Sequence, residues 1–228
     1  MQKMVYGIAT CLWSGWKECC ESWNATASEK YSGSIVFNKR VLDAYQIIFE
    51  ETKEPIIAYI HDDVMIYEQD WDLRVLKQFE DPQVGLVGFG GALRLGHPDI
   101  YKIPYELPQL ARYDFMSNMR NAEAHGQRFS GECDVATLDG FAMFVRRSVL
   151  ENFGGWPLGL PMNYFMYDNF LACQVRRQGL KTRLVGVDCE HLGGKTASMM
   201  QLPDSHSAAH EWFYEEFRDV LPFAVEEI

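Results

Sequence analysis

The sequence is short of basic residues: 21 Lys and Arg stand against 32 Asp and Glu among 228 residues, which gives a formal net charge of −11. A field of that sign repels phosphate backbones and anionic lipid, so nucleic-acid binding and membrane-surface binding are both disfavoured. A small nucleotide ligand is still allowed, because a bound divalent cation can invert the sign of one pocket.

Paired metal-type cysteines and long apolar runs are also absent. No CxxC pair occurs among the six cysteines, and reduced thiols in a cytosolic protein are a better interpretation than a disulfide framework. No stretch approaches the ~18 apolar residues that a membrane helix requires, and residues 1–13 lack the small-residue cleavage site of a signal peptide. We therefore expect a soluble, cytoplasmic protein, whose oligomeric state the sequence leaves open.

Length and composition are those of one globular domain. Apolar residues make up 47% and charged residues 23%, and no internal repeat or linker rich in Gly, Ser or Pro divides the chain. Residues 90–132, rich in Gly and Pro, are expected to be irregular. The predicted strands are 4–10, 56–60, 84–89, 135–138, 141–145 and 182–187, and the predicted helices are 16–23, 38–50, 70–79, 148–152, 168–178 and 207–220. This alternation predicts a single α/β domain with a mixed, mostly parallel sheet flanked by helices, which binds its ligand at the carboxyl ends of the strands.

His61, Asp62 and Asp63 follow directly on the apolar run 56–60, at the point where burial should cease. Two adjacent carboxylates and an imidazole repel and desolvate one another unless a cation joins them. One or two carboxylates, with water and substrate phosphates completing the coordination, is how Mg²⁺ or Mn²⁺ is usually held. The tripeptide on its own fits a metal site and a solvated acidic turn equally well.

Three later segments place polar groups beside predicted strands and helices. Asp139 and Gly140 open an apolar strand, where a tight turn explains the glycine but not the acid. Asp168 begins a helix after an aromatic loop, where an Asp is ordinarily a cap that contributes about 1 kcal/mol. His191 follows a strand and precedes a Gly-Gly-Lys segment ending at Lys195, which lacks the GxxxxGK[ST] spacing of a P-loop. Asp168 and His191 therefore each have an ordinary structural explanation, whereas Asp139 has none.

Taken in this order, the four segments resemble the GT-A fold glycosyltransferases, and most closely glycosyltransferase family 2. The resemblance covers roughly residues 34–195 and rests on IIAYIHDDV at 56–64, LDGFAMFVRRSVLENFGGW at 138–156 and YDNFLACQVRRQG at 167–179. These segments are similar to a strand with its DXD motif, to the acceptor-side strand and helix, and to the helix whose leading acid is the base. The implied Rossmann-like nucleotide-diphospho-sugar transferase domain has a nucleotide-binding half at about 1–90, an acceptor-binding half at about 91–206 and a closing helix at 207–228.

Carried over residue by residue, the resemblance implies a metal site and a base. Asp63 matches the last acid of the DXD motif, and His191 matches a second protein ligand to Mn²⁺ or Mg²⁺. His61 takes the place of the first acid, in contact with the ribose or the metal, and Asp62 takes the middle position beside the ribose. Asp168 matches the catalytic base.

Further positions are implied for the two substrates. On the nucleotide side are Thr10 and Cys11 at the base and Lys195 at the β-phosphate; on the acceptor side are Asp139, Gly140, Trp156, Tyr164, Phe165 and Tyr167. For Trp156, Tyr164 and Phe165, a place in the core explains the aromatic ring equally well. The chain departs from the family at residues 24–33, which are short and polar and show no second strand ending in an acid that reads the nucleobase. UDP is the expected carrier, with GDP and dTDP open.

The implied function is metal-dependent transfer of a sugar from a nucleoside-diphosphate sugar to a hydroxyl acceptor, with inversion. Breaking the C–O bond leaves negative charge on the diphosphate, which a divalent cation neutralises. A retaining transferase of the same fold is one alternative. A nucleotidyltransferase is another, although residues 10–13 are not the Gly-rich basic loop that it would show. The non-enzyme alternative is a degenerate glycan-binding module.

Overall fold

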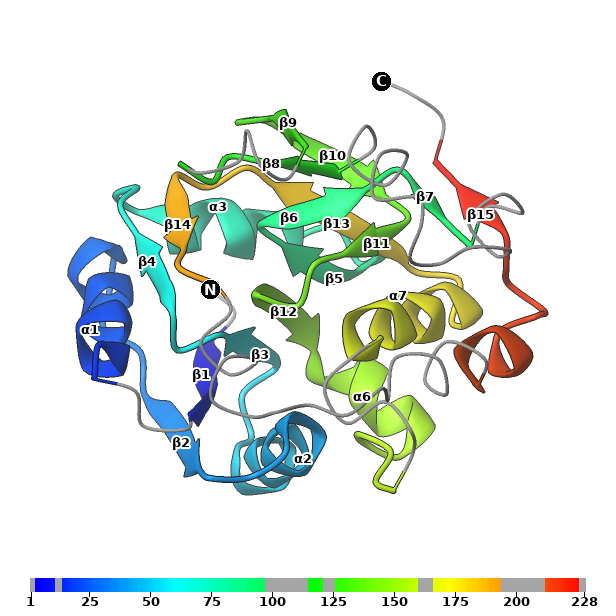
Figure 1. Ribbon diagram of the computed structural model, residues 1–228, viewed down its shortest axis with the longest axis horizontal. Coiled ribbons are helices and arrows are strands. Elements are labelled where there is room, and N and C mark those ends of the chain that lie inside the picture. The colour runs from blue at the N-terminus through cyan, green and yellow to red at the C-terminus, as the bar shows by residue number, and fades with distance from the viewer. Residues whose placement is uncertain are drawn as a thin grey trace.

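A seven-stranded mixed sheet forms the centre of the molecule (Figure 1). The computed structural model describes residues 3–10, 14–96, 115–120, 126–159, 166–193 and 212–225. Across the sheet the strands are, in order, β10 (Glu132–Val135), β13 (Lys181–Val185), β5 (Val84–Gly88), β12 (Ala142–Arg146), β3 (Ile56–Ile60), β1 (Met4–Thr10) and β2 (Gly33–Phe37).

Three of the six strand pairings are parallel and three are antiparallel, so the sheet is mixed as expected but more evenly than the sequence predicts. The difference comes largely from β12, which enters the centre of the sheet through a turn rather than a helical crossover and runs antiparallel to both β3 and β5. Ala142 therefore pairs with Ile60, and the start of β12 lies beside the carboxyl end of β3. This arrangement brings the turn before β12 to the candidate site.

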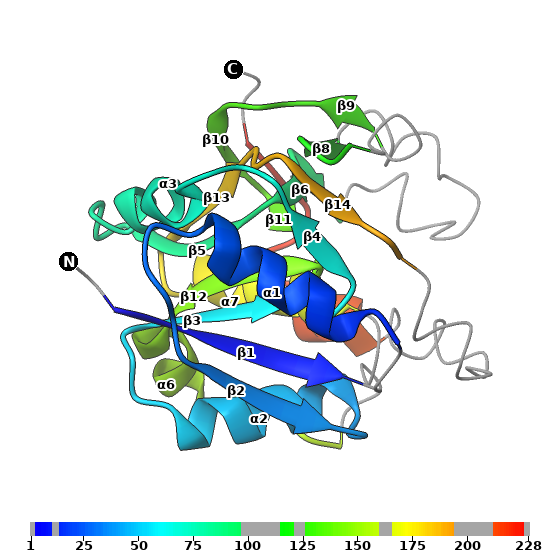
Figure 2. The same ribbon diagram turned by 90° about the vertical axis from the view of Figure 1, so that its left-hand side faces the viewer.

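Helices cover both faces of the sheet and enclose two apolar cores (Figure 2). One core lies under α1 (Trp16–Thr26) and α3 (Trp71–Gln78), and the other under α2 (Val41–Glu51), α6 (Arg147–Phe153) and α7 (Tyr167–Arg177). Every residue of β3 is buried, and its side chains alternate between the two cores as the two-residue period of a strand requires. The predicted helices at these five places are confirmed, with ends that shift by a few residues.

The interval that the sequence predicts to be irregular contains short strands. β6 (Gly90–Ala92), β8 (Phe115–Ser117) and β9 (Gln127–Arg128) form a second sheet with β11 (Thr137–Leu138), and β7 (Arg94–Leu95) pairs with β15 (Phe223–Ala224). A Cβ at Gly91 would lie 2.6 Å from the backbone oxygen of Thr137. The glycine therefore allows two strands to approach closely, whereas the sequence suggests only a turn.

A second strand, β2, lies between α1 and α2, contrary to the prediction that this interval contains none. β2 pairs in parallel with β1, from Gly33 opposite Tyr6 to Phe37 opposite Thr10. It is a short edge strand whose alternate residues are exposed, and its apolar run of three residues, Ile35 to Phe37, is too short to predict a strand by itself. β2 is followed by Asn38 in the left-handed region (φ 53°). The departure from the family pattern is thus the missing acid rather than a missing strand.

The chain closes against α7. Residues 212–216 are helical and residues 217–220 form turns, and Phe213 and Phe217 are fully buried in the same core as α7. Residues 207–211 of the predicted closing helix lie outside the described residues. Within the described part of the chain, no helix combines the length and apolar character that crossing a membrane would need.

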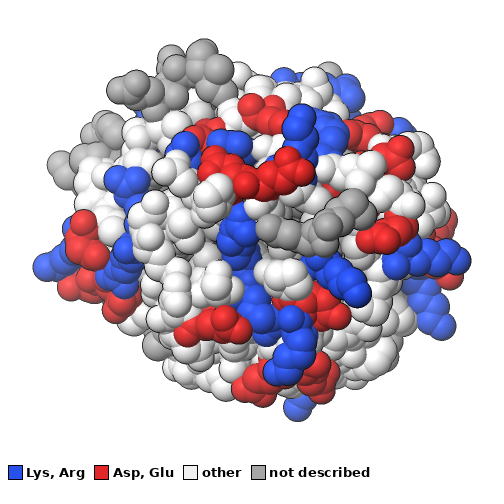
Figure 3. Space-filling model, turned by 180° about the vertical axis from the view of Figure 1, so that it is seen from behind, with Lys and Arg blue, Asp and Glu red and all other residues white. Residues whose placement is uncertain are grey.

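The described cysteines are free thiols, and charges of both signs are mixed on one face of the molecule. Cys19, Cys20, Cys133, Cys173 and Cys189 are all free, and Cys11 lies outside the described residues. On the face behind the view of Figure 1, Lys and Arg side chains are interspersed with Asp and Glu (Figure 3). Neither sign of charge forms a continuous surface on that face.

Candidate active site

A pair of short strands brings His191 beside the turn that follows β3. β4 (Val64–Ile66) begins just after His61, Asp62 and Asp63, and β14 (Cys189–His191) pairs antiparallel with it, with His191 opposite Val64. The backbone N–H of Leu192 donates to the Asp63 carbonyl at 2.9 Å. The segments around His61 and His191, which are far apart in the sequence, are therefore adjacent in space.

His61, Asp63 and His191 form a compact group whose candidate ligand atoms all lie within 4.8 Å of one another. His191 Nε2 is 3.2 Å from Asp63 Oδ1, and His61 Nδ1 is 4.0 Å from the same oxygen. The two imidazole rings are 5.5 Å apart, centre to centre. Two imidazoles and a carboxylate at these spacings suit a divalent metal ion.

The protonation states of Asp63 and His61 favour cation binding. Burial raises the pKa of Asp63, but the hydrogen bond from His191 and the charges of both imidazoles outweigh it and hold that pKa below its usual value. Burial lowers the pKa of His61 to about 4, with the His191 charge adding to the effect. Asp63 is thus ionised and His61 neutral at pH 7, the forms in which both bind metals.

The pKa of His191 moves the other way. Burial disfavours its charged form, yet the hydrogen bond to Asp63 and the Asp63 charge outweigh burial and raise the His191 pKa. Because the raised pKa strengthens the competition of protons with a metal ion for His191, binding at this site is expected to weaken as the pH falls.

Asp168 lies in the first turn of α7 but does not act as its cap. The N-cap position is Met166, in the left-handed region (φ 65°). One carboxylate oxygen of Asp168 accepts the backbone N–H of Gly140 at 3.0 Å, and the other accepts the N–H of Asn169 at 2.8 Å. The side chain therefore reaches across to the turn before β12, which a simple cap would not do.

The pKa of Asp168 is raised to about 7. Burial is the main cause and the nearby charge of Asp139 adds to it, while the hydrogen bonds from Asn169 and Gly140 oppose it. Asp139 shares the same turn: its N–H donates to the Gly90 carbonyl at 2.9 Å, and its carboxylate accepts the N–H of Phe141 at 3.2 Å. A carboxylate with a pKa near neutrality, such as that of Asp168, is suited to proton transfer.

The other predicted site residues fall into three groups. Asp62 is buried at the turn, and Thr10 ends β1, where its carbonyl accepts the N–H of Asn38 at 3.0 Å. Trp156 is only 2% exposed and packs on Tyr45 and Tyr59, so the structure places its ring in the core. Lying outside the described residues are Cys11, Tyr164, Phe165 and Lys195.

Two aromatic contacts at the site are absent from the sequence prediction. The ring of Phe141 stacks on His191 at 5.1 Å, and its carbonyl accepts the His61 N–H at 2.9 Å. Tyr167, predicted to face the acceptor, is buried and holds its hydroxyl 2.7 Å from His61 Nε2. The one signal in the sequence is the place of Phe141 directly after the Asp-Gly pair.

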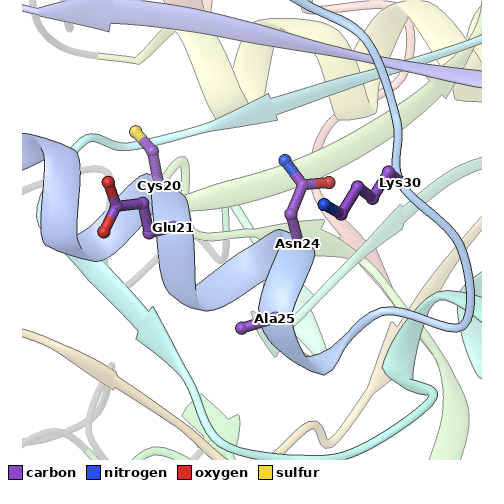
Figure 4. A pocket seen from close by; sticks show the side chains of 5 residues that line it. All are labelled: Cys20, Glu21, Asn24, Ala25 and Lys30. Atoms are coloured by element: carbon purple, nitrogen blue, oxygen red, sulfur yellow. The ribbon is translucent and has the colours of Figure 1, made fainter.

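A separate pocket lies on the outer face of α1 (Figure 4). It has a volume of about 360 Å³ and is lined by Cys20, Glu21, Asn24, Ala25 and Lys30. None of these belongs to the His61, Asp63 and His191 group, so this pocket is not part of the candidate active site.

The sheet order, the two helical layers and the acid and imidazole groups at the carboxyl end of β3 define a GT-A fold. The chain belongs to the glycosyltransferase-like family, whose model matches residues 31–211. No curated protein matches the chain by sequence.

Solved structures share this fold at low identity. The mannosyltransferase PcManGT from Pyrobaculum calidifontis, in complex with GDP-Man and Mn²⁺, is 13% identical with a TM-score of 0.54, over 85% of this chain and 58% of that one. GalNAc-T7 with UDP, GalNAc and Mn²⁺ is 9% identical with a TM-score of 0.59, over 84% and 44%. A197 from STIV is 13% identical with a TM-score of 0.50, over 85% and 87%. The chain thus spans about half the length of the two named transferases, and the likeness shows the fold.

Proposed function

We propose that the protein is a metal-dependent glycosyltransferase that moves a hexose from a nucleoside-diphosphate sugar, preferably a UDP-sugar, to a hydroxyl acceptor with inversion. The observation that carries the proposal is the juxtaposition of the His61, Asp63 and His191 group with Asp168 at one edge of the sheet. Both predicted halves of the domain contribute, because His61 and Asp63 come from residues 1–90 and His191 and Asp168 from residues 91–206. Family membership makes this chemistry the expected one.

The donor set fits Mn²⁺ or Mg²⁺ held by Asp63, His191 and His61. When bound, such an ion supplies Lewis-acid stabilisation of the diphosphate leaving group. Asp63 provides the one negative charge of the group and is kept ionised by its two imidazole neighbours. Two of the solved neighbours were crystallised with Mn²⁺ and a nucleotide or nucleotide sugar, which supports the same use here.

The nucleotide is proposed to lie along the carboxyl ends of β1 and β3. Thr10 and Cys11 would contact the base, Asp62 the ribose, and Lys195 the β-phosphate as a point charge. UDP remains our first choice of carrier. GDP is the specific alternative, because β2 leads into Asn38 instead of an acid and one neighbour carries GDP-Man.

Asp168 is proposed to be the general base. A carboxylate with a pKa of about 7 is ionised in half of the molecules at neutral pH and is basic enough to take the proton of an acceptor hydroxyl. The Gly140 N–H holds the carboxylate in place, and Asp139 sustains the raised pKa. The deprotonated oxygen then attacks the anomeric carbon from the face opposite the diphosphate, which inverts the configuration. The acceptor would lie against Asp139 and Gly140, with Tyr164 and Phe165 nearby.

A screen of nucleotide sugars tests the proposal. Hydrolysis and transfer are measured for UDP-, GDP- and dTDP-sugars with Mn²⁺, with Mg²⁺ and with EDTA, and the product anomer is determined by NMR. We expect metal-dependent turnover of a UDP-sugar with an inverted product. A retained anomer would overturn the role of Asp168, and turnover unaffected by EDTA would overturn the metal site.

The two remaining alternatives make different predictions in the same setting. A glycan-binding module would show no metal-dependent affinity for UDP in calorimetry, and a nucleotidyltransferase would release pyrophosphate from a nucleoside triphosphate. The free thiols are consistent with the cytoplasmic location that we propose for the protein.

A further inference from the structure

The two ring nitrogens of His61 have different surroundings. Nδ1 lies 4.0 Å from Asp63 Oδ1, within the group that suits a metal ion. Nε2 lies 2.7 Å from the hydroxyl of Tyr167. A neutral imidazole has one N–H and one lone pair, so the hydrogen bond on Nε2 decides whether Nδ1 is able to act as a ligand.

Tyr167 is held in place by the turn before β12. A Cβ at position 140 would lie 2.6 Å from two carbons of the Tyr167 ring and closer still to its hydroxyl, so only glycine allows the ring to sit there. Tyr45 packs edge-on against the same ring at 5.9 Å, and Tyr167 is buried. The hydroxyl is therefore a fixed feature of the site and does not depend on solvent or substrate to orient it.

The backbone fixes the other end of His61. Its N–H donates to the Phe141 carbonyl at 2.9 Å, one residue beyond Gly140. Gly140 itself donates to Asp168. The turn before β12 thus contacts His61 directly through Phe141 and indirectly through Tyr167.

We propose that Tyr167 is a positioning residue for the metal site: its hydroxyl oxygen accepts the Nε2–H of His61, which directs the Nδ1 lone pair toward Asp63 and His191. His61, Asp63 and His191 then act together as a site of two imidazoles and one carboxylate that selects transition-metal ions such as Mn²⁺ over Mg²⁺. This rests on the metal site of the proposed function and assigns its chemical preference. Imidazole suits transition metals, whereas Mg²⁺ favours oxygen ligands, and a ligating histidine ordinarily gives its second N–H to an oxygen acceptor.

The test measures metal binding without any sugar donor. Mn²⁺ is titrated into the full chain and followed by EPR, for the parent, Tyr167→Phe and the matched control Tyr31→Phe, whose hydroxyl bonds Asp72 at 2.7 Å on the other face of the sheet. We expect Tyr167→Phe to weaken Mn²⁺ binding about 10- to 100-fold. Tyr31→Phe, checked for folding by circular dichroism, should leave it within about twofold.

A second background separates positioning from a general loss of structure. In His61→Ala the hydroxyl has no imidazole to orient, so adding Tyr167→Phe should weaken Mn²⁺ binding no further. Pulsed EPR should show nitrogen coupling from two imidazoles in the parent and from one in His61→Ala. Competition with Mg²⁺ completes the set: His61→Asp should let Mg²⁺ displace Mn²⁺ at lower concentration than in the parent.

The outcomes that overturn the inference are distinct from those that overturn the function. Unchanged Mn²⁺ affinity in Tyr167→Phe, or an equal loss in the His61→Ala background, rejects the positioning role. Equal Mg²⁺ competition in the parent and His61→Asp rejects the selectivity. A chain that binds Mn²⁺ with this dependence on Tyr167 but transfers no sugar would reject the proposed function and leave the inference standing.

Discussion

Asp63 and Asp168 are two carboxylates at the same edge of one sheet, and their surroundings move their pKa values in opposite directions. Burial alone would raise the pKa of both. Asp63 faces the imidazoles of His191 and His61, which outweigh burial and lower its pKa. Asp168 faces the carboxylate of Asp139, which adds to burial and brings its pKa to about 7.

The comparison shows that neighbouring groups either oppose or add to the effect of burial on the pKa of an acid. A carboxylate paired with imidazoles stays charged and serves as a metal ligand, whereas one paired with another carboxylate holds a proton near neutral pH and serves in proton transfer. The Gly140 turn connects the two, since its N–H bonds Asp168 and its missing side chain makes room for Tyr167 against His61.

Removing the ionised member of the pair should have the largest effect. Asp63→Ala deletes the one charged ligand of the His61, Asp63 and His191 group, so we expect loss of measurable Mn²⁺ binding and a fall in kcat/KM of at least about 10³-fold. Isothermal calorimetry and steady-state kinetics measure the two effects. Asp43→Asn, which breaks an exposed ion pair with Arg40, is the control and should change neither. Retained Mn²⁺ affinity in Asp63→Ala would contradict the metal assignment.

Removing the other member should separate catalysis from metal binding. Asp168→Asn keeps the shape of the side chain but not its basicity, so we expect kcat to fall about 10²- to 10⁴-fold while Mn²⁺ affinity stays within twofold. Turnover within a few-fold of the parent would show that the base lies elsewhere.

The pH profile should report the raised pKa of Asp168. Because the base must be ionised, kcat/KM should rise with pH through about 7 and level off above it. Asp139→Asn removes the charge that raises this pKa and should move the midpoint to lower pH by roughly one unit. An unmoved midpoint in Asp139→Asn would mean that burial alone sets the value. Measurements from pH 5.5 to 9 with metal in excess decide the matter.

The smallest effect should be on stability. The folded-state pKa of Asp168 is about 7 against an ordinary value of 3.8, so the contribution of its protonation to stability is complete below about pH 4 and is lost as the pH rises through about 7. At pH 8 the folded parent therefore holds a poorly solvated carboxylate. Asp168→Asn should raise the free energy of unfolding there by about 1–2 kcal/mol, after allowance for partial exposure of the side chain. Urea unfolding at pH 8 and pH 4 tests this, since the gain should vanish at pH 4.

Strong local signals account for the part of the fold that the sequence predicted. The run Ile56–Ile60 is apolar at every position and is buried on both faces, as expected for a central strand. Helix α7 carries its acid in the first turn and Arg176 and Arg177 in the last, which agrees with the macrodipole. β2 and the strands between residues 90 and 132 escaped prediction because they are short, exposed or built around close-packed glycines.

The candidate site divides in the same way. The position of His61 and Asp63 at a strand end follows from the apolar run before them, and Asp168 follows from the start of its helix. For Trp156 the sequence left a place in the core and a place at the acceptor both open, because its contacts with Tyr45 and Tyr59 join segments far apart in the chain. The same is true of the hydrogen bond between His61 and Tyr167, which are 106 residues apart in the chain.

By itself, the sequence determined the class of fold, the strand that ends just before His61 and Asp63, and the set of residues able to do chemistry. The tertiary structure alone decided which of them meet: His191 reaches Asp63 only through the pairing of β14 with β4, and Asp168 reaches Gly140 only because β12 runs antiparallel beside β3. The shifted pKa values follow from these contacts, because nearby charges and desolvation act over a few ångströms in space and not along the chain. In a chain with a formal net charge of −11, tertiary contacts therefore lower the pKa of one carboxylate, Asp63, and raise the pKa of another, Asp168, to about 7.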